Sequence, residues 1–379
     1  MAEAWARTRA RERIEAIGKA SFDSTDLRRH ALEVLREVVD FDAYVWLLTD
    51  PATAVGAAPF ADVPCLPELP ALIKAKYATP INRWTDLQQR TSPTALLDEV
   101  VDGDLARSRV WREVMSRYGV RDVASTVFAD RFGCWGFLDL WRDQTSEPFT
   151  SADSTFIDSV ATSLTTALRE CHARTFVEAA APHRRDLGPV VLTLDEDLQI
   201  TSSRTAASQS WLDVLLPPGP EGRAIPASVY NVAAQLLAVE AGIDDRPAST
   251  RVHLSDGFWL TLRAARLASD PPESDSLAPG TGGIVVTIEE ASATERLDLF
   301  ARAVGLTARE YELLGWLATG SDTRAMARQM SPSEHTIQDH LKSIFTKTGS
   351  RDRVSVLSRA LGTKGDPHER PRRVVGGRG

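Results

Sequence analysis

The stretch SPSEHTIQDHLKSIF, residues 331–345, constrains the fold of this chain more than any other. Ile337, Leu341 and Ile344 recur at the spacing of one helical stripe, so they predict an amphipathic helix that packs on other helices. The opposite side consists of short polar and charged side chains: His335, Asp339, Lys342, Ser343 and Thr346. We expect this second face to contact a polar partner.

Length and composition predict a soluble protein of several domains. At 379 residues the chain is too long for one ordinary hydrophobic core, so we expect two or three domains. It has no run of about 18 apolar residues, and its N-terminus lacks the apolar core of a signal peptide. Cys65, Cys134 and Cys171 form no CxxC pair. Their odd number favours a reduced compartment, so we expect a cytoplasmic protein without a membrane partner.

The charge is divided unevenly along the chain. From residue 306 onward there are 13 Lys and Arg against 8 Asp and Glu, a net of +5, which leaves −13 for the preceding 305 residues. An acidic body with a basic end indicates that only the end approaches a polyanion. The alternative is a solvated basic tail, because residues 364–379 alone supply 5 of those 13 cations.

Residues 1–180 form a first block. Helical patterns at its start are followed by two strand candidates, residues 120–130 and 134–143, joined like a hairpin. A long helix is predicted after them, over residues 149–171.

A second block, residues 189–290, follows a polar linker at residues 181–188. Its pattern predicts two strands within residues 189–201, a helix at residues 227–242, and then three further strands. The polar, Pro- and Gly-rich stretch 269–283 is expected to be an exposed loop.

The third block, residues 292–362, is predicted to be all-α. It opens with a helix at residues 293–305, and Thr307 and Glu310 then form a Ser/Thr-x-x-Glu capping box. Asp322 and Ser333 are start signals for two further helices. Helix, tight turn and helix with a polar outer face is the helix-turn-helix arrangement. The tail, residues 363–379, is expected to be disordered and basic. The fold class is thus α+β and multidomain.

Residues 306–357 resemble the LuxR-type helix-turn-helix family of transcription factors. The residues that carry the resemblance, in unbroken register, are Leu306, Thr307, Ala308, Arg309, Glu310, Gly320, Ala327, Ser333, Thr336, Ile337, His340, Ile344, Lys347, Gly349 and Arg353. Any two of these residues alone would mean little, but the full set in one register without a gap is specific to the family.

The resemblance implies which side chains contact DNA. Gln338, Asp339 and Lys342 correspond to positions that meet base edges, with His335 at the helix entrance. The remaining implied contacts are to phosphates, which position the helix without reading sequence: Thr336, Arg324, Lys347 and Arg353. The family commonly has Lys at position 338, and Asp is unusual at 339, so the preferred base sequence is left open.

The first block resembles a GAF domain, chiefly through its closing helix, which implies an α/β/α sandwich. The second block resembles a PAS domain, which implies an antiparallel sheet with helices. Both folds offer a pocket between a sheet and its covering helices, which implies a small-molecule effector. The first block is rich in tryptophan, so Trp46, Trp84 and Trp111 are candidate ligand-binding residues. The alternative for each is plain core packing.

No enzyme chemistry is indicated. The chain has no GxxxxGK[ST], GxSxG or HExxH motif and no paired Cys/His metal spacing. His335 and His340 are five residues apart, so they do not share a helical face and are not a zinc pair. His30 and His172 lack any haem signature. We expect no catalytic residues, no metal and no cofactor.

These patterns predict a DNA-binding transcriptional regulator whose promoter binding is controlled by a signal at the GAF-like and PAS-like domains. Because one helix-turn-helix covers a half-site, we expect a homodimer on an inverted repeat of double-stranded DNA. RNA polymerase is a further candidate partner. The alternative from another class is a signalling adaptor that binds a protein through its terminal helices. The sequence does not identify the effector, the target genes or the direction of regulation.

Overall fold

The chain divides into two compact units. The computed structural model describes residues 2–176, 189–201, 226–254, 258–267, 282–330 and 333–362. The first unit comprises Met1–Cys171, Asp186–Leu254 and Trp259–Glu290, and the second comprises His172–Arg185, Ser255–Phe258 and Ala291–Gly379. The two blocks expected as separate sensor domains therefore lie in one compact unit. Among the described helices, none is long and apolar enough to cross a membrane.

A five-stranded antiparallel sheet, in the order β2-β1-β5-β4-β3, is the centre of the first block. Its strands are β1 Ala43–Thr49, β2 Gly56–Asp62, β3 Thr94–Leu96, β4 Val120–Asp130 and β5 Gly133–Asp143. The predicted hairpin is confirmed as β4 and β5, which pair along nearly their whole length. Both strands are buried on both faces, because helices and loops cover the sheet on each side.

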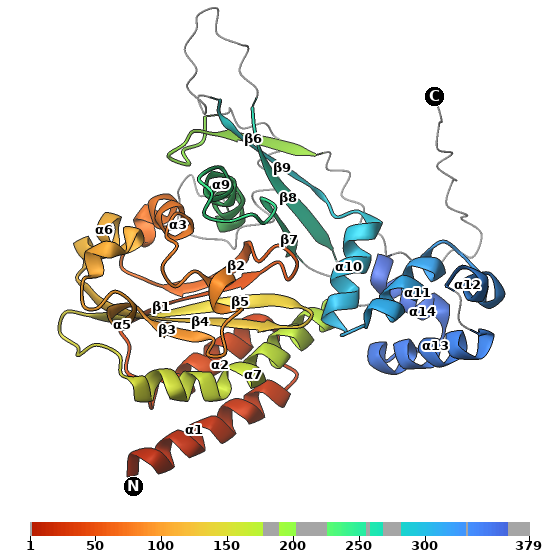
Figure 1. The fold of residues 1–379 in the computed structure, drawn as a ribbon, viewed down its shortest axis with the longest axis horizontal. Helices are drawn as coiled ribbons and strands as arrows, with labels where there is room; N and C mark the ends of the chain where they lie inside the picture. The colour runs from red at the N-terminus through yellow and green to blue at the C-terminus, as the bar shows by residue number, and fades with distance from the viewer. Residues whose placement is uncertain are drawn as a thin grey trace, which may run out of the picture. The chain divides into compact units, whose positions relative to one another are not determined.

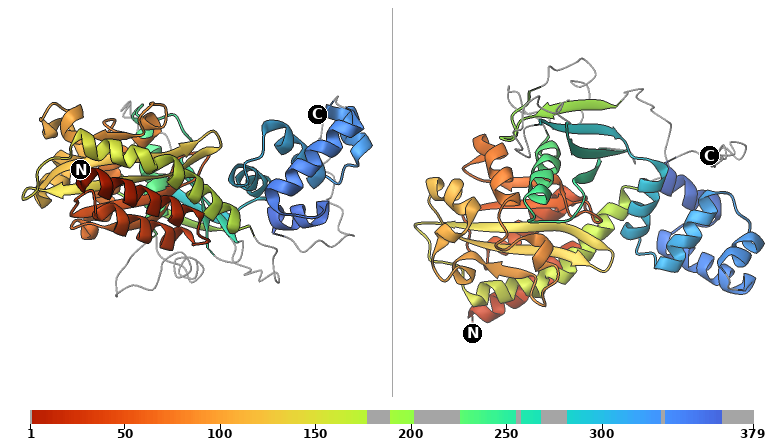
Figure 2. Two further views of the ribbon diagram at one scale, coloured as in Figure 1. Left: turned by 90° about the horizontal axis from the view of Figure 1, so that it is seen from below. Right: turned by 45° about the horizontal axis from the view of Figure 1, so that its top comes forward.

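Helices cover both faces of this sheet. Three long helices lie side by side along one face (Figures 1 and 2): α1 Ala2–Lys19, α2 Ser24–Arg36 and α7 Ser151–Arg174. The connection from β2 to β4 holds shorter helices: α3 Leu69–Tyr77, α4 Trp84–Leu87, α5 Leu97–Val100, α6 Arg109–Glu113, and the 3-10 turns Leu66–Glu68, Leu105–Arg107 and Met115–Tyr118. Of these, α3 and α6 lie over the opposite face (Figure 1).

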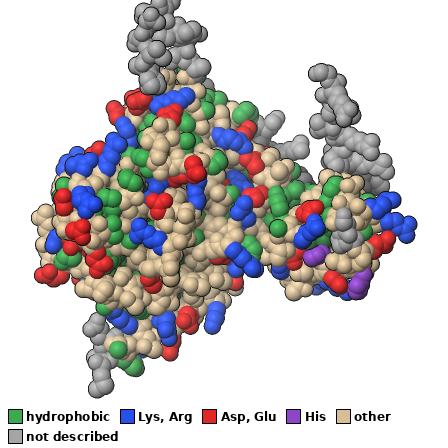
Figure 3. All heavy atoms as spheres, viewed as in Figure 1, with side chains coloured by type: hydrophobic (Ala, Val, Ile, Leu, Met, Phe, Trp, Pro, Cys, Tyr) green, Lys and Arg blue, Asp and Glu red, His purple; other side chains and the backbone are tan. Residues whose placement is uncertain are grey.

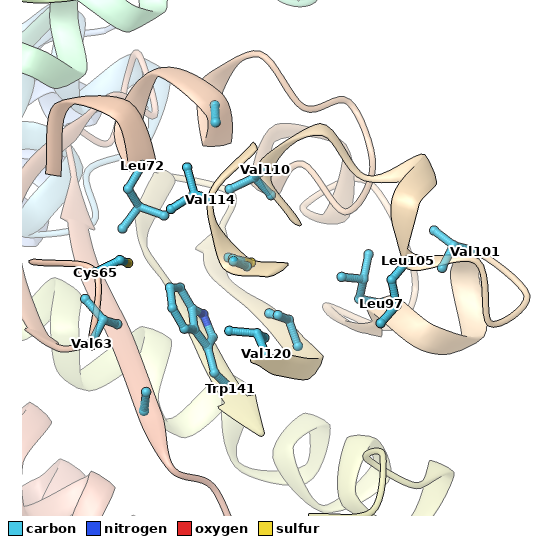
Figure 4. Packing of buried hydrophobic residues seen from close by; sticks show 14 residues of the cluster. Val63, Cys65, Leu72, Leu97, Val101, Leu105, Val110, Val114, Val120 and Trp141 are labelled. Atoms are coloured by element: carbon cyan, nitrogen blue, oxygen red, sulfur yellow. The ribbon is translucent and has the colours of Figure 1, made fainter. Parts of the chain in front are cut away.

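The short helices enclose a buried apolar cluster with the second sheet face. Figure 4 shows Trp141 of β5 among Val63, Leu72 and Val120, which come from three other segments of the chain. Burial of this set removes apolar surface from water, which is the main favourable contribution to folding.

The second block forms a four-stranded antiparallel sheet in the order β6-β9-β8-β7. Its elements are β6 Val190–Leu194, α9 Ala227–Glu240, β7 Ser249–His253, β8 Trp259–Arg266 and β9 Ile284–Glu290. Of the two strands predicted before α9, the first is confirmed; in the second, Ile200 makes an isolated bridge to Leu194. The linker 181–188 and most of the predicted loop 269–283 lie outside the described residues. Figure 1 shows α9 between the two sheets, and it packs on α3, β2 and β8.

A buried ion pair ties the second block to the first. Asp50 follows β1, and its carboxylate accepts hydrogen bonds from Nε of Arg251 at 2.6 Å, from Nη2 of Arg251 at 2.8 Å and from the Arg251 backbone N–H at 3.0 Å. Burial by itself would raise the pKa of Asp50, but the Arg251 guanidinium and the N–H groups of Ala52 and Thr53 outweigh it and hold the pKa below its usual value. The pair is therefore charged at neutral pH.

A second buried cation strengthens this contact. Arg83, before α4, is 2.7 Å from Asp244 and donates to the Gln235 side chain of α9 at 3.1 Å. Two hydroxyl groups add direct bonds across the junction, from Thr53 to the Ser249 carbonyl and from Thr250 to the Val55 carbonyl. The junction between the blocks is thus polar, buried and hydrogen-bonded throughout these residues.

The second unit contains five helices among its described residues. They are α10 Ala293–Ala303, α11 Ala308–Ala318, α12 Thr323–Met330, α13 Glu334–Thr348 and α14 Arg353–Leu361. The predicted capping box is confirmed, because the Thr307 hydroxyl accepts from the Glu310 N–H and the Glu310 carboxylate accepts from the Thr307 N–H. The predicted tail lies outside the described residues.

Glu310 also braces α11 against α13. Its buried carboxylate accepts from Lys347 Nζ at 2.6 Å and from Ser343 Oγ at 2.6 Å. Burial raises the pKa of Glu310, but the bonds from Lys347, Ser343 and Thr307 have the larger combined effect and lower the pKa to about 2.

We predict that Asp50→Asn lowers the free energy of unfolding of the first unit by about 3–5 kcal/mol, because Arg251 would remain buried without its counter-charge. Urea denaturation followed by tryptophan fluorescence measures this change. The matched control is Glu113→Gln, which breaks the exposed Arg109–Glu113 pair and should change stability by about 0.5 kcal/mol or less. Equal effects of the two substitutions would contradict a stabilising role of the Asp50–Arg251 pair.

Glu310 should make the helical unit acid-sensitive in a defined range. Because its pKa is lower in the folded state, its contribution is fully present above its usual value of 4.5 and is lost as the pH falls towards about 2. Glu310→Gln should therefore speed hydrogen exchange in α11 and α13 at pH 7, and its difference from the unmodified protein should shrink below pH 4.5. Glu312→Gln, at a half-exposed position on the same helix, serves as the control. A difference that grows on acidification would contradict this assignment.

Candidate DNA-recognition surface

The helix α13 is built as its sequence predicts. The Ser333 hydroxyl accepts from the Thr336 N–H and so begins the helix, and Gly349 ends it in the left-handed conformation, with φ of 63°. Ile337, Leu341 and Ile344 are buried against the rest of the unit. This packing fixes which side of α13 is turned outward.

The outward side carries the residues predicted to meet bases. The side chains of His335, Lys342 and Asp339 have exposed fractions of 81%, 74% and 55%, and Gln338 is exposed as well. Figure 3 shows histidine, basic and acidic side chains close together on the surface of this unit. The structure thus brings the four candidate base-reading positions onto one exposed face, while their contact with DNA remains a prediction.

Asp339 lies between a histidine and a lysine on this face. Its carboxylate lies 3.6 Å from His335 Nε2 and 3.5 Å from Lys342 Nζ. Exposed pairs of this kind contribute little to stability, so these partners are free to exchange for other ones. The acid nevertheless offsets part of the positive charge that a phosphate backbone would meet.

The residues predicted to hold phosphates fall into two groups. Arg324 and Thr336 are exposed, and Arg324 pairs with the exposed Glu334 at 3.3 Å. Lys347 is bound to the buried Glu310, and Arg353 donates to the Thr323 hydroxyl. Lys347 and Arg353 therefore have structural partners within the unit, which the sequence did not indicate.

Two further features were not predicted. Ser343 was expected on the polar outer face, but its hydroxyl donates to Glu310 and so belongs to the packed side. Arg328, in the last turn of α12, is exposed and makes no ion pair among the described residues. It is an additional candidate for a phosphate contact. The sequence did not single it out; its exposure in the last turn of α12 does.

The three tryptophans predicted as ligand-binding residues lie in packed surroundings. Trp46 is fully buried on the face of the first sheet that carries α2 and α7, stacked on Phe128. Trp84 stacks on Phe137 and donates to the Ala54 carbonyl, and Trp111 donates to the Val120 carbonyl. A cavity of about 220 Å³ opens on the other face of the sheet; its described lining residues include Trp141 and none of these three.

The described residues contain no group of three or more His, Cys, Asp or Glu side chains placed to hold a metal ion. The three cysteines are buried and form no disulfide. His335 and His340 differ in surroundings, since His335 is exposed and His340 is half-buried.

Comparison with known proteins identifies the helical unit. Residues 304–360 match the family described as bacterial regulatory proteins, luxR family. The monoamine regulon transcriptional regulator of Klebsiella aerogenes is 39% identical over 54 residues, which are 14% of this chain and 24% of that protein. The chain therefore spans about a quarter of the length of this curated relative.

A solved structure of SdiA from Escherichia coli aligns with 96% of this chain and 99% of its own, at 13% identity and a TM-score of 0.33. So low a score carries no argument about the fold or ligand of the first unit. The family match and the observed helix-turn-helix geometry agree over the same residues. Residues 304–360 are a LuxR-family helix-turn-helix domain within a longer chain.

Proposed function

We propose that this protein is a transcriptional regulator that binds double-stranded DNA through α13 and whose binding is controlled through the first unit. The observation that carries the proposal is the exposed polar face of α13, on a domain that matches the LuxR family. A helix of this kind enters the major groove, where side-chain amides and cations read base edges. We assign no enzymatic step to the protein.

One such domain covers a half-site, so we infer that two copies bind an inverted repeat. Among the exposed side chains, Gln338 suits adenine, Lys342 suits guanine and Asp339 suits the cytosine N4 amino group. Arg324, Thr336 and Arg328 supply phosphate contacts.

The first unit serves as the sensor in this proposal. The helix, strand and hairpin order of the first block supports a GAF-like sensor in this proposal, and the antiparallel sheet of the second block supports a PAS-like one. The chain passes from β9 through Ala291 to Ser292, which begins α10 with a capping box to Glu295. A rearrangement of β9 therefore has a short covalent path to the reading helices.

A second path runs through the end of α7. Phe176, two residues beyond that helix, packs edge-on against Phe300 of α10 with ring centroids 5.3 Å apart. Its carbonyl accepts from Nε of Arg359 of α14 at 2.8 Å. A ligand acts on DNA affinity only through a preference for one arrangement of these elements.

Charge reversal on the reading face should abolish DNA binding without unfolding the domain. We expect Lys342→Glu and Arg324→Glu each to weaken binding to a selected duplex site by at least tenfold, because both side chains are exposed and carry no buried partner. Fluorescence anisotropy measures binding, and circular dichroism checks folding. The control is Arg11→Glu, an equal charge change on α1. Unchanged binding by both reading-face variants would refute the assignment of this face.

Two measurements distinguish a DNA-binding regulator from an adaptor that binds a protein: the salt dependence of DNA affinity and the effect of replacing Asp339. DNA affinity should fall steeply with salt, and Arg324→Gln, which removes one phosphate contact, should reduce the logarithmic slope by about one. Asp339→Asn should tighten binding to random duplex, because it removes a negative charge from the face, while it weakens binding to a selected site in which Asp339 contacts cytosine. An affinity independent of salt would favour the adaptor.

A further inference from the structure

The cavity in the first unit lies between the five-stranded sheet and two helices from different blocks. Its volume is about 220 Å³. Phe137, Asp139 and Trp141 alternate along β5 and so face it together. Leucines, valines and other apolar side chains of β1, β2 and α3 supply most of the remaining lining. A mainly apolar cavity tends to stay dry and to hold apolar molecules.

Four buried polar atoms in the cavity lining have no hydrogen-bond partner among the residues that the structure describes. They are Asp139 Oδ1, Trp141 Nε1, and both the Oδ1 and the Nδ2 of Asn231. The Asp139 side chain is 4% exposed, Trp141 2% and Asn231 1%. Because buried polar groups are nearly always hydrogen-bonded, unpaired groups gathered at one cavity indicate a partner outside the chain.

The charges at the cavity cancel. Lys76 Nζ of α3 lies 2.7 Å from Asp139 Oδ2, so this carboxylate already has a counter-charge and only its other oxygen is unpaired. Burial of a further net charge beside this pair would be costly. The cavity therefore favours an uncharged molecule.

The second block contributes one wall. Ala227 and Asn231 project from α9, whereas the rest of the lining belongs to residues 45–141. Asn231 packs closely on Gly56, where an added Cβ would lie 2.6 Å from Asn231 Nδ2. The Gly56 N–H donates to the Tyr77 hydroxyl at 2.9 Å, which fixes this part of the wall. The two blocks thus enclose one site together.

We propose that this cavity binds one uncharged, mainly apolar molecule of about the size of a bicyclic aromatic. Its polar group donates a hydrogen bond to Asp139 Oδ1 and accepts one from Trp141 Nε1 or the Asn231 amide. The size follows from the volume, because a cavity of about 150 Å³ holds benzene. The binding site stands on the geometry alone, whereas its role as the effector site rests on the proposed function.

The probe for this site is 2-naphthol, an uncharged fluorescent bicyclic with one hydroxyl group. We expect saturable binding to the full chain, measured by naphthol fluorescence and calorimetry. Naphthalene-2-sulfonate has the same rings but a negative charge, and it should bind at least tenfold more weakly. Tighter binding of the sulfonate would overturn the assigned ligand class.

Two substitutions test the location. Val45 lies directly opposite Asp139 in the sheet and lines the cavity, so Val45→Phe should fill it and abolish naphthol binding. Asn231→Leu keeps a side chain of similar shape and should weaken binding about three- to tenfold, the effect of one lost hydrogen bond. Naphthol affinity unchanged in both variants would overturn the site.

Stability separates a ligand-binding role of Asn231 from a structural one. Replacing an unpaired buried amide with an apolar group should leave the melting temperature unchanged or raise it. A fall in melting temperature with unchanged naphthol affinity would show a structural role instead. The matched control is Thr261→Val on β8, which also removes a buried unpaired polar atom but lies outside the cavity lining. It should leave naphthol affinity unchanged.

The effector role is tested separately with the same proteins. Naphthol should change the affinity for a selected DNA site in the unmodified protein and not in Val45→Phe. Naphthol binding without any change in DNA affinity would overturn the effector role and leave the site intact. Naphthol binding by a protein with no affinity for any duplex would instead contradict the proposed function.

Discussion

The buried pair of Asp50 and Arg251 is the interaction on which the first unit depends. Two charges removed from water are costly unless each finds its counter-charge and hydrogen bonds, and here both oxygens of Asp50 are satisfied by Arg251. The same carboxylate also accepts from the backbone of Arg251 and of Ala52. The first residues after β1 and the strand β7 are therefore held in one relative position, because any slip would leave a buried charge unpaired.

Because of this constraint, the two blocks enclose one cavity between them. With β7 fixed against the β1–β2 turn, α9 lies over β2 and α3, and Asn231 reaches Gly56. A sheet of the first block and a helix of the second then enclose the same space. A molecule in that space contacts both blocks at once. The helix α9, which lines the cavity, also packs on β9, and β9 continues through Ala291 directly into α10.

Local patterns in the sequence predicted much of this structure. The β4–β5 hairpin, α7, α9 and the capping box of Thr307 are where alternation, helical spacing and capping residues place them. Pairings between distant residues were not predictable. No local pattern shows that Asp50 meets Arg251 or that Lys347 meets Glu310, because residue type alone does not choose among many possible partners. The aromatic content of the first block was visible, but only the sheet register shows that Trp46 and Trp141 face opposite sides.

The acidic body and the DNA-binding proposal are compatible because electrostatic attraction acts over a limited distance. At physiological salt, charges more than about 8 Å apart are largely screened, so a phosphate responds to the nearest side chains and not to the net charge of −8. On α13 the nearest exposed cation, Lys342, has Asp339 beside it. Lys347 is hydrogen-bonded to Glu310. Arg324 and Arg328 on α12 are therefore the less restrained cations. A helix-turn-helix domain with so few available cations binds DNA weakly as a single copy. Its DNA affinity therefore gains most from a second copy of the domain on the same duplex. A ligand can then control DNA affinity through the spacing of the two domains.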